Sequence, residues 1–482
     1  HVVNNVRGNS GLKIKFMNLK TKITLIFILT IFLSCSNETD DSNSPINSEI
    51  ETITPSFGYE GDEIIFEMTN AIPSSANVSI TYNGQSAVIN EINGTTIKHI
   101  VPNNPESSII LTINGQETYI NSASDLRPLK KYIDCENCRE KAFVSNINVP
   151  TDNILDINKI NNNIYLIKTK DSQFSNEAST SLIKTDLDFN IIEENTLFNA
   201  HPNSNILFEN NNFIIQKDFD LVSYDYSGNL LWSYNISNLT SGYQSYKNTI
   251  VKVNSNYYLY KNAVPVENIT EPIQVLRLDN NGQLIATIDI PISNTTNYWS
   301  HTGKFLTTLN NNIVGITSLS GNVSNYDTDA YFVIDNSNNI LKNSLSNIDF
   351  INSNPYVEGN SIYYNEGSSY PNPNSPVLKK ISLDNNNNLN TDWTRQDNGI
   401  IAKLDNKYIM FPPKNNSGYN AIKVFSDNNF NGYDFIDIEG VRYGNTARVF
   451  GNEVYLFGNR TIFFANDYHA LIGKYDLNNI IN

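Results

Sequence analysis

The sequence predicts an all-β protein with two folded parts, a small β-sandwich and a larger ring of repeated sheets. From residue 49 onward, short runs that alternate apolar and polar residues are separated by turns rich in Asn, Asp and Gly. These roughly 440 residues exceed the length at which one hydrophobic core usually divides, so two or more domains are expected. A turn motif that recurs seven times in the second part predicts the ring.

The first 34 residues are predicted to be absent from the mature protein. Residues 1–16 precede Met17 and have no apolar periodicity, so we interpret them as a mis-called extension. Basic residues follow Met17, and an apolar run then covers residues 23–33. As an α-helix this run would be about 16 Å long, roughly half of the hydrocarbon core of a bilayer. Residues 17–34 are therefore predicted to be a signal peptide.

The signal peptide ends in Phe32-Leu33-Ser34-Cys35, which resembles the lipobox of bacterial lipoproteins. Phe32 departs from the usual Leu of that motif. The resemblance implies that Cys35 carries fatty acids such as palmitate and becomes the mature N-terminus. Three acyl chains would exceed the two signals that stable membrane anchoring requires. The alternative is an ordinary signal peptide with an incidental cysteine.

Residues 35–48 are polar and acidic, and we expect them to form a flexible tether. Acidic residues directly after the cysteine resemble the surface-export signal of Bacteroidota lipoproteins. This implies a lipid-anchored protein of the outer membrane, on the cell surface or on the periplasmic face. The net charge of −16 repels phosphate backbones and argues against nucleic acid as a partner.

Residues 49–121 are predicted to form the small sandwich. Its alternating runs are Glu63–Glu67, Asn77–Tyr82, Thr95–Val101 and Ile109–Ile113. The opening stretch, Ile50–Phe66 with Pro55 and Gly61-Asp62, resembles the IPT/TIG immunoglobulin-like family. It departs after Phe66, where Glu67-Met68-Thr69-Asn70 replaces a Gly-rich turn. The resemblance implies a spacer or interaction module more than a catalyst.

Residues 122–141 form a connector that holds Cys135 and Cys138. If Cys35 is acylated, these two cysteines remain, and in an oxidising compartment we expect them to pair. A redox-active pair would need a thioredoxin-like βαβ setting, and a zinc site would need a second pair of ligands. Both alternatives stay open, as do free thiols.

Residues 142–482 contain the repeat, in which apolar alternation ends in an Asp-rich turn. Successive copies are separated by 39 residues (Asp186 to Asp225) up to 56 residues (Asp279 to Asp335), near the blade size of a β-propeller, about 40–50 residues. An Asn- or Gly-containing turn precedes each copy, which predicts the order strand, Asn turn, strand, variable loop, strand, Asp turn, strand. The copies end at Asp186, Asp225, Asp279, Asp335, Asp384, Asp427 and Asp476.

The ring is predicted to close through a strand from the start of the repeat region. The last copy leaves only six residues after Asp476, too few for a fourth strand, and residues 142–149 could supply it. Closure would remove exposed sheet edges. A seven-bladed β-propeller is therefore favoured, with six or eight blades or a β-solenoid as alternatives.

Several motifs resemble known sites. Tyr224–Trp232 resembles the docking repeat of pyrroloquinoline-quinone-type propellers, in which the Trp packs between blades. Ser223–Asp225 is similar to the sialidase Asp-box, but Gly228 falls one place late. Both are predicted to be structural turns. Asp427–Gly432 matches the first half of an EF-hand loop, yet Ile438 stands where calcium binding requires Glu. No cofactor or metal site is therefore predicted, with calcium as the alternative.

No catalytic residue is predicted. The exported part has four widely separated histidines and no nucleophile elbow, Walker loop or dinucleotide fingerprint. The longest loops, between second and third strands, should gather on one face, where Tyr326, Tyr370 and Tyr419 could stack on a sugar or hold a peptide. Ordinary solvated loops are the alternative. The predicted function is non-catalytic binding of a glycan or protein, with a polysaccharide hydrolase or lyase, or a structural envelope component, as alternatives.

Overall fold

A computed structural model gives the fold of the chain. It describes residues 48–103, 105, 108–122, 125–129, 138–143, 152–172, 175–202, 205–236, 249–261, 272–291, 298–321, 328–346, 355–366, 377–396, 399–411, 421–432, 434–437, 446–461 and 468–476. These residues form strands and no helix. The predicted all-β class is therefore confirmed.

The N-terminal part is a sandwich of two four-stranded sheets, with strand orders β1-β3-β7-β6 and β5-β4-β8-β9, and a separate parallel pair, β2 with β10. The predicted runs match β3, β4, β7 and β8, and the hairpins turn at Asn-Gly pairs with positive φ, Asn83-Gly84 and Asn114-Gly115. The strands are β1 (Ile50–Thr54), β2 (Phe57–Tyr59), β3 (Glu63–Met68), β4 (Val78–Tyr82), β5 (Gln85–Ser86), β6 (Val88–Asn93), β7 (Thr96–Ile100), β8 (Ser108–Ile113), β9 (Gln116–Asn121) and β10 (Arg127–Leu129).

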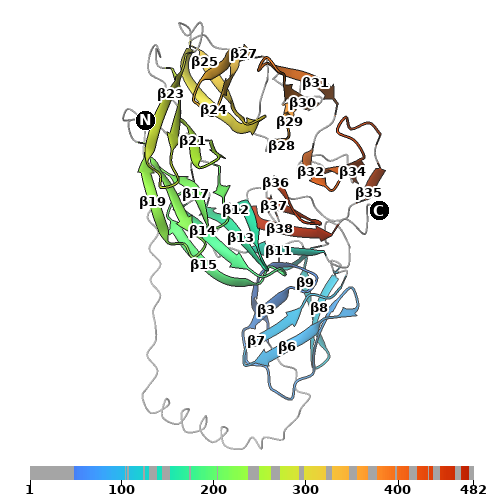
Figure 1. Ribbon diagram of the computed structural model, residues 1–482. Helices are drawn as coiled ribbons and strands as arrows, with labels where there is room; N and C mark the ends of the chain where they lie inside the picture. Colours follow the sequence, from blue (N-terminus) through green and yellow to red (C-terminus); the bar gives the residue numbers. More distant parts are fainter. Residues whose placement is uncertain are drawn as a thin grey trace, which may run out of the picture.

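The rest of the described chain forms seven four-stranded antiparallel sheets arranged in a ring, a propeller-like fold (Figure 1). We number these blades in chain order. They are β12 (Asn153–Ile160), β13 (Asn163–Ser172), β14 (Ser175–Thr185), β15 (Ile191–Phe198); β16 (Leu207–Phe208), β17 (Asn212–Lys217), β18 (Asp220–Asp225), β19 (Leu230–Asn235); β20 (Ile250–Val253), β21 (Asn256–Lys261), β22 (Ile273–Leu278), β23 (Leu284–Ile290); β24 (Tyr298–Leu309), β25 (Asn312–Gly321), β26 (Thr328–Ile334), β27 (Ile340–Ser346); β28 (Tyr356–Glu358), β29 (Ser361–Glu366), β30 (Val377–Leu383), β31 (Leu389–Arg395); β32 (Ile400–Leu404), β33 (Lys407–Phe411), β34 (Ala421–Phe425), β35 (Asp434–Asp437); and β36 (Thr446–Phe450), β37 (Glu453–Thr461), β38 (Tyr468–Asp476) with β11 (Arg139–Phe143).

Within each blade the first strand lies innermost and the fourth outermost (Figure 1). The predicted order of strands and turns is confirmed in blades 1 to 6.

The closure of the seventh blade differs in detail from the prediction. β11 pairs with β38, but it begins at Arg139, three residues before the predicted segment, and residues 144–149 lie outside the described ranges. Because this outermost strand starts with charged residues, apolar alternation did not reveal where it begins.

The Asp turns share one hydrogen-bond pattern, which explains their recurrence. In the first turn, the Oδ1 atom of Asp186 accepts hydrogen bonds from the backbone N–H groups of Asp188 and Asn190, with N to O distances of 2.9 Å each. The Asn190 side chain donates to Oδ2 of Asp186 at 2.8 Å. A side chain that satisfies its own turn favours this geometry locally. The two bonds to Oδ1 recur at Asp225, Asp279, Asp335, Asp384 and Asp427.

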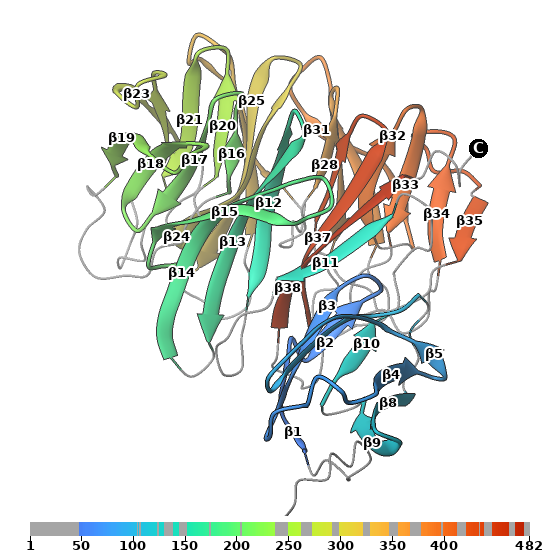
Figure 2. The same ribbon diagram turned by 90° about the horizontal axis from the view of Figure 1, so that it is seen from below.

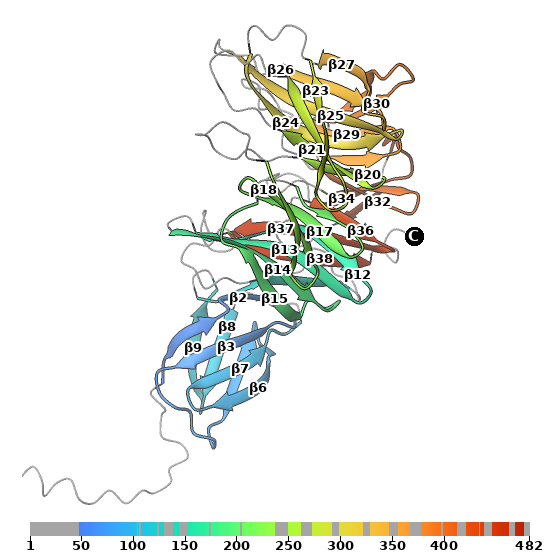
Figure 3. The same cartoon turned by 60° about the vertical axis from the view of Figure 1, so that its left-hand side comes forward.

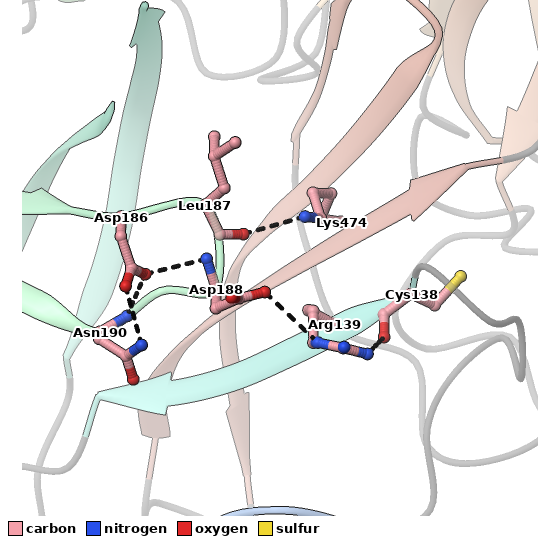
Figure 4. A network of polar contacts seen from close by, with 7 residues as sticks. All are labelled: Cys138, Arg139, Asp186, Leu187, Asp188, Asn190 and Lys474. Atoms are coloured by element: carbon pink, nitrogen blue, oxygen red, sulfur yellow. Dashed lines mark hydrogen bonds and ion pairs between the residues drawn. The ribbon is translucent and has the colours of Figure 1, made fainter. Parts of the chain in front are cut away.

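Each of the six described Asp turns also contacts the blade before it. At the closure, Lys474 of β38 donates to the Leu187 carbonyl at 3.0 Å, and the Arg139 guanidinium lies 3.5 Å from the Asp188 carboxylate (Figure 4). Between blades 2 and 3, the Trp232 ring covers Gly282, as the docking resemblance implied. These contacts join neighbouring blades outside their apolar cores.

The main packing lies between blades. In the described residues, seven clusters of buried apolar side chains each join two adjacent blades. The cluster between blades 6 and 7 continues into the sandwich through Phe57, Tyr59 and Leu129. The Phe57 ring lies 4.7 Å from that of His469, and Lys141 forms an ion pair with Asp62 at 2.9 Å. The sandwich is thus packed against one edge of the ring, where β2 contacts β11 (Figures 2 and 3).

Candidate functional site

Most of the residues singled out from the sequence lie outside the described ranges. These are Cys35, Cys135, Tyr326, Tyr370 and Tyr419. Their proposed roles stay predictions. Cys138 is described: it is fully buried just before β11 and is disulfide-bonded, while its predicted partner Cys135 falls outside the described residues.

The most conspicuous polar feature of the ring is a set of ion pairs between neighbouring blades, formed by residues on or next to their first and second strands. Lys252 of β20 lies 2.5 Å from Glu209, the residue after β16. Lys159 of β12 lies 2.5 Å from Glu453 of β37. The third pair joins Lys403 of β32 to Glu358 of β28, and the fourth joins Arg448 of β36 to Asp156 of β12 at 3.0 Å. We call these four pairs the inner ion pairs.

Tyrosine hydroxyls complete three of the inner ion pairs. Tyr257 donates to Glu209 at 2.7 Å, Tyr455 to Glu453 at 2.8 Å, and Tyr408 to Glu358. Each glutamate therefore accepts one hydroxyl hydrogen bond and pairs with one ammonium group, so its desolvation is offset.

These contacts lower the pKa of two of the glutamates, Glu358 and Glu453. Burial acts to raise the pKa of Glu358, but hydrogen bonds from Lys403 and Tyr408 outweigh it and hold the pKa below its ordinary value. At Glu453, burial is likewise outweighed by hydrogen bonds from Lys159 and Tyr455. A general acid of a glycosidase needs the opposite, a raised pKa that keeps the carboxyl protonated. These glutamates are arranged to join blades and are poorly suited to proton transfer.

Two aspartates at the start of blade 1 have raised pKa values. Burial raises the pKa of Asp152 against the opposing charge of Lys168, whose Nζ atom lies 3.4 Å from Oδ2. Burial also raises the pKa of Asp156 against the charge of Arg448. Asp152 has no exposed surface, so its carboxyl has no route to a polymeric substrate in this conformation.

An exposed acid–base pair lies beside Asp152. The backbone N–H of Asp171 donates to Asp152 at 3.3 Å, and the Asp171 carboxylate lies 2.7 Å from Nε2 of His201. His201 is about half exposed. Among the described residues, no group of three or more His, Cys, Asp or Glu side chains could hold a metal ion. The Asp427 carboxylate accepts the hydrogen bonds of its own turn, as the turn aspartates of the other blades do.

The sequence does not predict the inner ion pairs, although a local signal marks the lysines. Lys159, Lys252 and Lys403 each stand two residues before a turn residue with positive φ, at Asn161, Asn254 and Asp405. The glutamates have no corresponding turn signal in the sequence, because each lies on a different blade from the lysine with which it pairs.

Comparison with known proteins gives distant structural likenesses. No protein-family model matches the chain, and no curated protein matches it. An auxiliary nutrient binding protein from Bacteroides thetaiotaomicron is similar at 12% identity and a TM-score of 0.30, over 90% of this chain and 99% of that one. A protein of unknown function from the same organism is similar at 11% identity and a TM-score of 0.30, over 90% and 98%. The polysaccharide lyase Uly1 is similar at 5% identity and a TM-score of 0.41, over 67% and 90%. At these values the likenesses carry no argument about activity or ligand. In the described residues, no helix is long and apolar enough to cross a membrane.

Proposed function

We propose that this chain is an exported lipoprotein, anchored to the outer membrane through acylated Cys35, whose propeller binds a glycan or a protein without catalysis. One observation carries the non-catalytic part. In the described residues, the four carboxylates of the inner ion pairs are paired with lysine or arginine, and two of the glutamates have a lowered pKa. Such groups stabilise a scaffold and leave recognition to the loops.

The proposed binding surface is the face on which the loops between second and third strands lie. Equivalent loops project from the same side of every blade, and from their sequence positions we expect Tyr326, Tyr370 and Tyr419 to belong to that side. The described strands support this assignment, because β25 ends before Tyr326 and β29 ends before Tyr370. Tyrosine offers an apolar ring and a hydroxyl, which suits both sugar and peptide ligands.

A polysaccharide hydrolase or lyase is the second candidate, because burial raises the pKa of Asp156 in the direction that a general acid requires. One experiment separates the two. Purified residues 36–482 are applied to a microarray of bacterial and host glycans, and every glycan bound is then incubated with the protein and assayed for new reducing ends and unsaturated products. Binding without products, lost in the triple variant Tyr326→Ala, Tyr370→Ala and Tyr419→Ala, supports the proposal. Products that disappear in Asp152→Asn or Asp156→Asn contradict it.

The anchor is tested separately. Cells that express the full chain are labelled with an alkyne analogue of palmitate, and we expect label in the wild type and none in Cys35→Ser. Protease treatment of intact cells, compared with cells whose outer membrane has been permeabilised, then distinguishes surface display from a periplasmic position. Labelled Cys35→Ser protein would contradict acylation at this residue.

A further inference from the structure

The outermost strands of blades 1 to 4 begin with two consecutive aliphatic residues, both exposed. In each blade the pair stands five and six residues after the turn aspartate. The exposed fractions range from 37% to 56%. The pairs, which we call the aliphatic rim, are Ile191-Ile192, Leu230-Leu231, Leu284-Ile285 and Ile340-Leu341.

A β-bulge produces this exposure in all four blades. In blade 2, Tyr224 pairs with Leu230 and Ser223 pairs with Trp232, so Leu231 is an extra residue in the outer strand. The same shift occurs at the corresponding position of blades 1, 3 and 4. A bulge leaves the extra residue unpaired and re-aims its side chain. In blade 5 the shift lies elsewhere, and the second residue of the pair is Asn390.

This repetition separates the rim from ordinary scattered apolar surface. Single exposed aliphatic residues need no explanation, whereas a contiguous apolar patch on a monomer usually marks an interaction site. The outermost strands β15, β19, β23 and β27 follow one another around one side of the ring (Figure 1). The rim pairs therefore stand on the outer edges of four successive blades.

The size of the rim argues against a stable protein interface. Eight half-exposed aliphatic side chains present roughly 250–500 Å² of apolar area, whereas a standard protein interface buries about 800 Å² on each partner. The arc is also convex, so a flat surface can meet only two neighbouring outer strands at once (Figure 1). A surface to which the chain is already attached can be bound through a smaller contact area than a free partner can.

The charges favour a neutral partner surface. β19 carries no charged residue, and β23 carries one, Asp289. Neither strand has the lysines or arginines that draw a protein to anionic lipids. Trp232 and Tyr234 follow Leu231 on β19 and pack against the buried cluster between blades 2 and 3, so Trp232 places a fluorescent ring close to the rim.

The proposed anchor supplies the proximity. Ser48, where the described residues begin, is 13 residues beyond Cys35 (48 − 35), which allows at most about 45 Å from the acyl chains. A link of this length holds a second contact at an effective concentration in about the millimolar range. We propose that the rim of blades 2 and 3, Leu230, Leu231, Leu284 and Ile285, lies on the neutral lipid headgroups of the membrane that carries the anchor. This inference rests on the proposed function.

The test replaces the acyl anchor with an artificial one. Residues 36–482 with an N-terminal hexahistidine tag are held on phosphatidylcholine vesicles that contain a nickel-chelating lipid, with and without brominated acyl chains. We expect bromine to quench tryptophan fluorescence in the wild type, and the quenching to be lost in Trp232→Phe and in the double variant Leu231→Asp with Ile285→Asp. Val88→Asp is the matched control, because Val88 is an exposed aliphatic residue of the sandwich, 65% exposed. It should keep the quenching.

The outcomes are distinct. Equal emission from brominated and plain vesicles in the tethered wild type would overturn the proposal. So would a dimer in sedimentation velocity that the double Asp variant dissociates, because the rim would then serve a second copy of the chain. Failure of acylation would appear in the palmitate labelling and would leave the vesicle result untouched. Circular dichroism and melting temperature confirm that each variant is folded.

Discussion

Docking between blades can be measured at Gly282. This residue has a φ of +75°, and a Cβ atom placed on it would lie 2.3 Å from the Trp232 ring. Gly282→Ala therefore carries two costs. The left-handed backbone conformation costs about 1–2 kcal/mol for an L-residue, and overpacking against the indole costs about 1–3 kcal/mol. We expect a loss of about 2–5 kcal/mol in the free energy of unfolding.

Gly359→Ala provides the matched control. Its φ is +59°, and a Cβ atom there would meet nothing within 4 Å, so only the backbone cost of about 1–2 kcal/mol applies. Urea unfolding of residues 36–482, followed by far-ultraviolet circular dichroism, measures both variants. Adding Trp232→Ala to Gly282→Ala should cost less than the sum of the two single changes. Equal costs for the two glycine variants, together with strict additivity, would refute the docking role of Trp232.

Three further predictions address the inner pairs, the turns and the closure. Lys403→Met leaves Glu358 without its cation and should lower the free energy of unfolding, measured in urea, by about 1–3 kcal/mol. Adding Glu358→Gln should restore most of this loss. If it restores none, Lys403 and Glu358 do not stabilise the protein as a pair. The backbone N–H of Asn388, and then its side chain, donate hydrogen bonds that lower the pKa of Asp384 from 3.8 to about 2. The ionised carboxylate therefore stabilises the folded state fully above pH 3.8, and this stabilisation is lost as the pH falls through about 2. The melting temperatures of wild type and Asp384→Asn should differ at neutral pH and converge near the lower value; a constant difference would contradict this. Deletion of residues 468–482 removes the partner of β11 and should abolish the cooperative melting transition of the propeller, whereas an unchanged transition would show that closure by β11 is dispensable.

The sequence predicted the fold wherever the responsible interactions are local. The Asp turns are an example, because Asp186 bonds to groups two and four residues further along the chain. The hairpin at Asn83-Gly84 is another, since both residues adopt the positive φ that such a turn demands. Repetition of local signals at blade-sized intervals then indicated the ring.

Features that depend on distant partners could not be predicted in this way. Lys159 and Glu453 are 294 residues apart in the chain, and no local pattern joins them. The consecutive pair Leu230-Leu231 has the pattern of a buried run, yet a bulge exposes both side chains. The binding roles of Tyr326, Tyr370 and Tyr419 stay predictions.

The pairing of β11 with β38 also sets the order of events during folding. A hydrogen bond from Tyr475 to Glu140 spans 335 residues, so the seventh blade can form only after the C-terminal strand β38 is available. Until then, the first six blades stand as an open arc with an unpaired edge, a state prone to aggregation. Contacts of such long range are also slow to form. The strands of the sandwich all precede the repeats in the chain, so the sandwich can fold first. β11 is then available to pair with β38 when that strand arrives.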